Sequence, residues 1–208
     1  MHTVVYDSSE PAANDFGFAR IAEENDIILI DASAVQASNG QRDNEYGTHM
    51  HNQRERLLYL TLLDNLFSDK IFVSPGVGEE IRFFLRDLPE FPMPGRYRRM
   101  LSYVLDKISG RVIETTDDEK ECMQRIATVT KSSRRLMSDQ DYEMLLYGLA
   151  LANHRGTTGI LTNDAVLRRV FSDMSYLLKE AGYEQRNRLT VYSKFRRPKF
   201  GLESTYPF

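Results

Sequence analysis

The feature that most constrains the fold is an alternation of short apolar runs with longer helical patterns. The run Ile27-Ile28-Leu29-Ile30 is continuous and β-branched, which is typical of a strand covered on both faces. Comparable runs occur at residues 71–73, 159–162 and 189–192. Because helical patterns separate these runs, we expect a three-layer α/β/α fold around a central, mostly parallel sheet of about four to five strands.

Several helix starts can be read from the sequence. Ser74-Pro75 places a capping serine before a proline in the first turn, and Ser138 to Asp141 has the spacing of a capping box. Thr116 is expected to cap a helix that ends near Thr130, and Asp164 to open another. The remaining expectations are helices at residues 53–67 and 96–108 and a short strand at residues 111–114.

The chain of 208 residues is long enough for one compact domain with additional helices. We expect residues 1–26 to form an N-terminal extension that packs on the domain, with Pro11 opening a helix toward Asn25. Residues 27–195 would form the domain, and residues 196–208 a basic C-terminal tail.

The composition limits the cellular setting. No stretch approaches the roughly 18 apolar residues of a membrane helix, and the first residues lack the pattern of a signal peptide. The single cysteine, Cys122, gives neither an internal disulfide nor a cysteine-rich metal site, and we interpret it as a packing residue. These features predict a cytoplasmic protein without a membrane partner.

Two acidic side chains follow buried strands directly. Asp31 ends the first apolar run, and Asp164 follows Ile160-Leu161-Thr162-Asn163. The carboxyl ends of parallel strands form the rim of the sheet where ligands bind. We therefore expect both carboxylates at this rim, with Thr162 and Asn163 in supporting positions.

Helical phase selects two further acids. At 100° per residue, Glu80 lies on the flank of the apolar face of its helix, whereas Glu79 lies almost opposite and is expected to be solvated. Asp141 shares the inward phase of Leu145 and Gly148, and its competitor Asp139 has a poorer phase. Gly148 would let this helix approach the sheet closely.

Four converging carboxylates repel one another, and a hard divalent cation relieves that repulsion. Asp31, Glu80, Asp141 and Asp164 are therefore the candidate catalytic and metal-binding residues, with Mg²⁺ or Mn²⁺ as the cofactor. Such a metal site activates water and stabilises in-line displacement at phosphorus. Taken singly, each acid is more often a helix cap than a ligand.

The ordered set of motifs resembles the PIN-domain nucleases. The matching pieces are Ile28 to Ser33, Val73-Ser74-Pro75 leading to Glu80-Ile81, Ser138 to Asp141 with Leu145, and Ile160 to Asp164. The resemblance spans about residues 27–195 and implies Mg²⁺- or Mn²⁺-dependent cleavage of single-stranded or structured RNA, leaving a 5′-phosphate and a 3′-hydroxyl. It also implies partners of the family's kinds, a protein inhibitor or antitoxin and a homodimer. The N-terminal extension and the long segment between Glu80 and Asp141 depart from the compact toxin-type members.

Basic residues near the C-terminus are candidates for nucleic-acid binding. They lie among aromatic residues in a stretch without acids, an arrangement suited to phosphate contacts and base stacking. A solvated edge strand and tail explains them equally well. The residues are Arg186, Arg188, Lys194, Arg196, Arg197 and Lys199.

Two weaker features are an arginine cluster and a pair of histidines. Arg96, Arg98 and Arg99 favour a solvated helix face. His49 and His51 lack a nearby third ligand, so a loop over residues 38–52, in the position of a substrate lid, is the better interpretation.

Two other functions remain open at this point. A PIN-like module that binds RNA or protein without cutting would not need the four acids, and it would show no stabilisation by divalent ions. A phosphatase of the Asp-x-Asp type would need a second acid where Ser33 stands. An endoribonuclease is the prediction that uses all four acids, and the sequence does not exclude DNA as its substrate.

Overall fold

A computed structural model describes residues 18–35, 64–65, 69–88, 95–162, 164–184 and 186–192. Four parallel strands form one sheet in the order β2-β1-β3-β4. The strands are β1 (Ile27–Ile30), β2 (Ile71–Phe72), β3 (Thr158–Leu161) and β4 (Leu189–Tyr192). The expected α/β/α fold with a parallel sheet is therefore confirmed.

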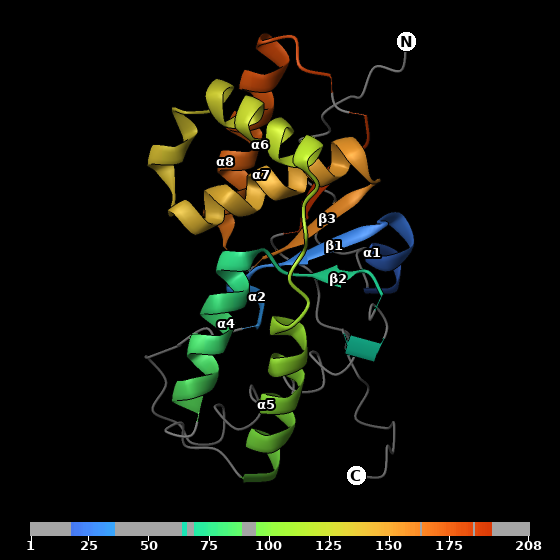
Figure 1. Ribbon diagram of the computed structural model, residues 1–208, viewed down its shortest axis with the longest axis vertical. Coiled ribbons are helices and arrows are strands. Elements are labelled where there is room, and N and C mark those ends of the chain that lie inside the picture. Colours follow the sequence, from blue (N-terminus) through green and yellow to red (C-terminus); the bar gives the residue numbers. More distant parts are fainter. Residues whose placement is uncertain are drawn as a thin grey trace.

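Helices lie on both sides of the sheet (Figure 1). α6, α7 and α8 lie on one side, and α4 with α5 lies on the other. The helices are α1 (Phe18–Glu24), α2 (Ala32–Val35), α4 (Pro75–Asp87), α5 (Gly95–Ser109), α6 (Asp117–Val129), the 3-10 helix η2 (Ser133–Leu136), α7 (Asp139–His154) and α8 (Ala165–Glu180).

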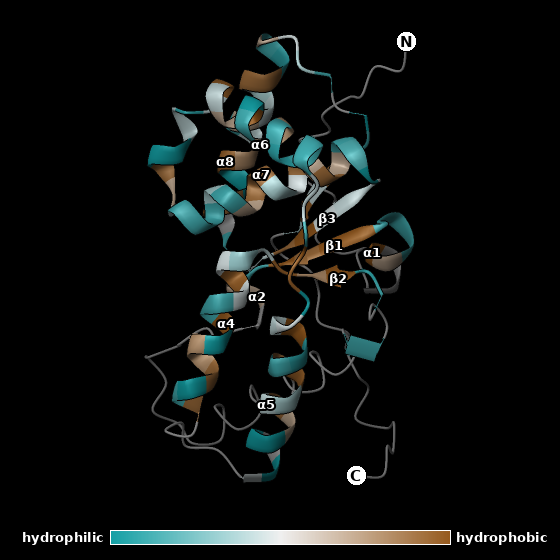
Figure 2. Ribbon diagram, in the orientation of Figure 1, coloured by the Kyte–Doolittle hydropathy of each residue, from teal (hydrophilic) through white to brown (hydrophobic). Residues whose placement is uncertain are grey.

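The core is centred on β1, β3 and α7. All four residues of β1 and of β3 are buried, in agreement with the apolar run of β1 and with Ile160 and Leu161 in β3. Figure 2 shows this apolar centre between helices whose outer faces are hydrophilic. α7 crosses β1, β3 and β4, and nine consecutive residues from Met144 to Ala152 are buried, as is Tyr142.

Gly148 permits the close approach of α7 to the sheet, as its phase predicted. A Cβ atom at this position would lie 2.9 Å from Cδ1 of Ile160 in β3 and 3.1 Å from Cδ1 of Leu189 in β4. Both neighbours are buried. The absence of a side chain therefore sets the distance between the helix and the sheet.

The expected helix starts at Ser74, Thr116, Ser138 and Asp164 are confirmed. Each side chain accepts a hydrogen bond from a backbone amide in the first turn of its helix. The expected strand at residues 111–114 is wrong in extent. Only Val112 forms a bridge, with Val73, because Ser74 directly after Val73 already caps α4.

The sequence pattern missed two short elements and leaves one helix outside the description. α2 begins directly after Asp31, and η2 precedes the cap of α7; neither was expected. Of the helix predicted over residues 53–67, the structure describes Asp64 and Asn65 as helical and omits the rest. In the N-terminal extension it describes α1, whose Ile21 is fully buried.

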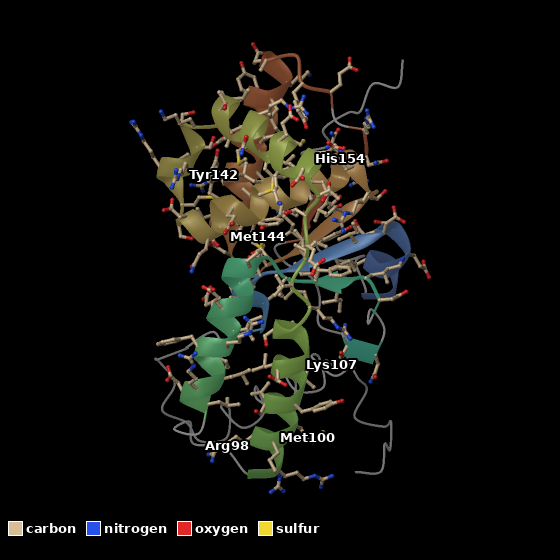
Figure 3. All side chains as sticks on the ribbon, viewed as in Figure 1. Arg98, Met100, Lys107, Tyr142, Met144 and His154 are labelled. Carbon is tan, nitrogen blue, oxygen red and sulfur yellow. The ribbon has the colours of Figure 1, made fainter. Side chains whose placement is uncertain are left out.

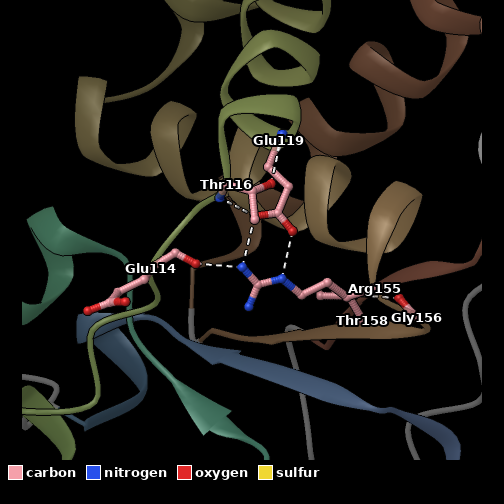
Figure 4. A network of polar contacts seen from close by, with 6 residues as sticks. All are labelled: Glu114, Thr116, Glu119, Arg155, Gly156 and Thr158. Carbon is pink, nitrogen blue, oxygen red and sulfur yellow. Dashed lines mark hydrogen bonds and ion pairs between the residues drawn. The ribbon is translucent and has the colours of Figure 1, made fainter.

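An ion pair joins the far end of α7 to the start of α6 (Figure 4). Nε and Nη2 of Arg155 donate to the two carboxylate oxygens of Glu119, at 2.6 and 2.8 Å. Nη2 also donates to the carbonyl oxygen of Glu114, and Glu119 completes the capping box with Thr116. Burial raises the pKa of Glu119, but the hydrogen bonds from Arg155 and Thr116 outweigh it and the pKa is lowered.

Among the helices in the described segments, none combines the length and apolar character needed to cross a membrane. Figure 3 shows polar side chains distributed over the outer faces of the helices, with labelled examples such as Arg98 and Lys107 on α5 and His154 on α7.

Candidate functional site

Asp31 lies at the carboxyl end of β1 and is almost completely buried. The backbone amide of Asp31 donates to the carbonyl oxygen of Leu161 in β3, so the main chain at this residue is still hydrogen-bonded to the sheet. Oδ2 accepts a hydrogen bond from Oγ1 of Thr162 at 2.6 Å and a second from Oγ of Ser33. The two hydroxyls lie 3.2 Å apart, so Ser33, Thr162 and Asp31 form one compact polar group.

The surroundings of Asp31 shift its ionisation. Burial raises the pKa of its carboxyl group, the hydroxyl hydrogen bonds from Ser33 and Thr162 lower it, and the negative charge of Asp141 raises it again. The net direction is upward. Asp31 is therefore a buried carboxylate whose pKa is raised in part by a second carboxylate from another element.

Asp141 reaches this environment from α7. It lies in the first turn, is partly buried, and exchanges two hydrogen bonds with Ser138: its amide donates to Oγ at 3.1 Å and its Oδ2 accepts from Oγ at 2.6 Å. Asp139 instead is exposed and pairs with Arg134 at 2.8 Å. Of these two acids, Asp141 is the one whose charge acts on the ionisation of Asp31.

Asp164 is connected to Asp31 through Thr162. Its amide donates to Oγ1 of Thr162 at 2.9 Å, and its own Oδ1 accepts from the amide of Val166 at 2.7 Å. Asp164 is thus the N-cap of α8, and the capping bond uses one of its oxygens. Asn163 lies outside the described residues.

Glu80 enters from the opposite side of the sheet. It is partly buried on α4 whereas Glu79 is exposed, as helical phase predicted, and α4 contacts α2, the helix that starts after Asp31. Glu79 has a different electrostatic neighbour: burial raises the pKa of Glu143 on α7, and the charge of Glu79 raises it further. α4 thus brings the charge of Glu79 close to Glu143 at its contact with α7.

The acids do not form a closed metal-binding group. Within the segments that the structure describes, no three His, Cys, Asp or Glu side chains are placed to hold a metal ion together. What the structure brings together is Asp31, Ser33 and Thr162, with Asp164 linked by a backbone hydrogen bond and Asp141 by electrostatics. All the donors are oxygens, and a buried carboxylate repelled by another is an arrangement that Mg²⁺ or Mn²⁺ would relieve.

Ser33 is the site residue to which sequence reasoning gave no role. A hydroxyl residue two positions after a strand-end acid was the available signal, because a turn of chain there can bring the side chain back to the carboxylate. α2 provides that turn, and the amide of Ala34 donates to the carbonyl oxygen of Asp31 at 3.0 Å.

The structure describes only some of the remaining residues that the sequence suggested for a functional role. Arg186 and Arg188 are exposed just before β4, while Lys194, Arg196, Arg197 and Lys199 lie outside the described residues, as do His49, His51 and the proposed lid at 38–52. Cys122 is fully buried, in agreement with its interpretation as a packing residue, and its sulfur lies 3.0 Å from the hydroxyl of Tyr183.

The fold and site define a class of protein: a parallel α/β domain with carboxylates and hydroxyls at the carboxyl rim of its sheet. Comparison of the chain with protein-family models, curated proteins and solved structures gives no match.

Proposed function

We propose that this protein is a Mg²⁺- or Mn²⁺-dependent endoribonuclease of the PIN type, which cleaves RNA to leave a 5′-phosphate and a 3′-hydroxyl. The observation that carries the proposal is the buried Asp31 carboxylate at the end of β1, held by two hydroxyls and repelled by Asp141. A bound cation would stabilise the charged form of a carboxylate in these surroundings.

In this mechanism Asp31 and Asp141 would hold the metal ion, and Asp164 and Glu80 would complete its carboxylate surroundings. The chemistry that such an ion would supply is the activation of water and compensation for the charge that develops on the phosphate. Thr162 and Ser33 fix the orientation of Asp31, since both hydroxyls donate to the same oxygen. Burial of Asp31 excludes bulk water from that carboxylate and strengthens its electrostatic interactions.

Cleavage of a labelled RNA with Mn²⁺, and with EDTA as the blank, tests the proposal. Asp31→Asn and Asp141→Asn are expected to lower the rate at least about 100-fold, the scale on which removal of one electrostatic group slows an enzyme. Asp139→Asn is the matched control for Asp141→Asn, because Asp139 occupies the same first turn but pairs with Arg134 on the surface.

Glu80 has a matched control as well. Glu80→Gln is expected to slow cleavage, whereas Glu79→Gln, at the exposed neighbouring position, is expected to leave the rate close to that of the wild type. Undiminished activity of Asp31→Asn would rule out the mechanism. RNA binding without any Mn²⁺-dependent cleavage in the wild type would instead favour a non-catalytic binding module.

A further inference from the structure

Two described segments next to the candidate site are basic and free of acidic residues. One is residues 131–138, which includes η2, and the other is residues 165–172, the first half of α8. η2 contacts both α8 and α7. The basic residues of the two segments are Lys131, Arg134, Arg135, Arg168 and Arg169.

Both segments join the site through their ends. The first ends at Ser138, whose hydroxyl hydrogen-bonds to Asp141, and the second begins directly after Asp164. A ligand bound along α8 and η2 would therefore have one end at the carboxylates. This continuity distinguishes these basic residues from the arginines of α4 and α5, which lie on the other side of the sheet (Figure 1).

The outer face of α8 has a defined composition. Val166, Arg169, Asp173 and Tyr176 recur at spacings of three and four residues, so they form one stripe, and all four are exposed. The opposite stripe, Leu167, Val170, Met174 and Leu178, is buried. The side chain of Tyr176 is 63% exposed, so its ring is accessible to a ligand, and it lies about 10 Å along the helix from Arg169.

We infer that the face formed by Arg135, Arg169 and Tyr176, the α8/η2 face, binds single-stranded RNA and leads it to the carboxylates. The inference rests on the proposed nuclease function. Guanidinium groups contact phosphates and an exposed aromatic ring stacks on a base, which together are the means by which proteins hold single strands. Arg134 is excluded from the face because it already pairs with Asp139.

RNA binding without catalysis tests the inference directly. The probe is a fluorescein-labelled uridine 12-mer, and anisotropy is measured in EDTA, so that failure to cleave and failure to bind are separate results. Each lost phosphate contact reduces the slope of log K against log salt by about 0.7 for a single strand, which corresponds to about fivefold in affinity at 0.1 M salt. The double variant Arg135→Ala/Arg169→Ala is therefore expected to bind about 25-fold more weakly, with a slope smaller by about 1.4.

The control variant also removes two positive charges, but on the other side of the sheet. Arg86→Ala/Arg99→Ala changes two exposed arginines of α4 and α5 and is expected to retain affinity within about twofold. Thermal unfolding of each variant verifies that it folds. Equal losses in the two double variants would show unspecific attraction to positive charge and overturn the inference, as would loss in Arg186→Ala/Arg188→Ala alone.

Two single substitutions test the details of the face. Tyr176→Leu is expected to weaken binding at least about fivefold while Tyr176→Phe retains it, because the ring and not the hydroxyl stacks on a base. Asp173→Asn is expected to tighten binding, since it removes the acid of the stripe. Unchanged binding in Tyr176→Leu, or tighter binding of a thymidine 12-mer than of the RNA, would overturn the assignment of this face to single-stranded RNA.

Discussion

The surroundings of Asp31 raise the free energy of its charged form. Burial and the charge of Asp141 oppose ionisation, and the two hydroxyl donors only partly offset them. Because the pKa of Asp31 is raised in the folded state, its contribution to stability is fully present at low pH and is lost as pH rises through the folded pKa. Asp31 therefore weakens the fold at neutral pH, which is the cost that a bound cation would remove.

The substitution Asp31→Asn is expected to stabilise the metal-free protein at pH 8 while it abolishes cleavage. Asparagine keeps an oxygen that can accept from Ser33 and Thr162 but carries no charge. The expected gain in the free energy of unfolding is up to about 2 kcal/mol, typical of a relieved functional site. It should shrink as the pH falls through the raised pKa of Asp31, because the wild-type carboxyl group then becomes protonated. Urea unfolding at pH 8 and over a series of lower pH values measures the effect, and a less stable variant at pH 8 would contradict it.

At the scale of elements, α7 connects the core to the site. Its inner face packs on β1, β3 and β4, and its first turn carries Asp141. A change in the distance between this helix and the sheet therefore also moves Asp141 relative to Asp31. Gly148 controls that distance, since a Cβ atom there would meet Ile160 and Leu189.

Gly148→Ala is expected to destabilise the protein by about 1 kcal/mol. Overpacking costs about 1–3 kcal/mol, and the better helix propensity of alanine returns up to about 1 kcal/mol. In an Ile160→Val background, which lacks the Cδ1 atom at 2.9 Å, the same substitution should cost less, although the contacts with Leu189 at 3.1 and 3.2 Å remain. Gly95→Ala is the control, because a Cβ atom there meets nothing within 4 Å. Equal costs of Gly148→Ala in both backgrounds, measured by denaturant unfolding, would contradict this account of the packing.

A second prediction at this scale concerns the ion pair between Arg155 and Glu119. Arg155→Met leaves a buried carboxylate without its partner and is expected to cost about 3 kcal/mol. The double variant Arg155→Met/Glu119→Leu should recover part of that loss, since no buried charge remains. A thermodynamic cycle built from unfolding free energies measures the coupling, and a double variant less stable than Arg155→Met would show that the capping box with Thr116 matters more than the pair.

The sequence predicted elements better than contacts, and α7 shows why. Its buried periodicity set the phase of Asp141 and Gly148, because both follow from helix geometry alone. The hydrogen bond from Ser33 depends on α2, a single turn too short to leave a periodic pattern, and the single bridge at Val112 depends on where α4 begins. Convergence of Glu80 with Asp31 is a tertiary distance that helical phase cannot supply, so it stays a prediction.

At the scale of the whole molecule, the candidate site draws on every layer. Asp31 and Asp164 come from the ends of strands, Asp141 from the α7 side and Glu80 from the α4 side (Figure 1). The charged side chains that give a net charge of −3 are unevenly distributed, because acids at the rim adjoin the basic α8/η2 face. A cation at the rim would therefore connect the two helical layers through the sheet.

This arrangement predicts that divalent ions stabilise the entire fold and do so through Asp31. A ligand that binds only the folded state adds about 2.7 kcal/mol at a concentration one hundred times its dissociation constant, which for a chain of this size raises the unfolding temperature by roughly 5–10 °C. Mn²⁺ should produce such a shift in the wild type and in Asp139→Asn, and little or none in Asp31→Asn. Since Asp31→Asn starts from a higher metal-free unfolding temperature, the curves of the two proteins should approach each other as Mn²⁺ is added. Equal shifts in wild type and Asp31→Asn would place the bound ion somewhere other than the carboxyl end of β1.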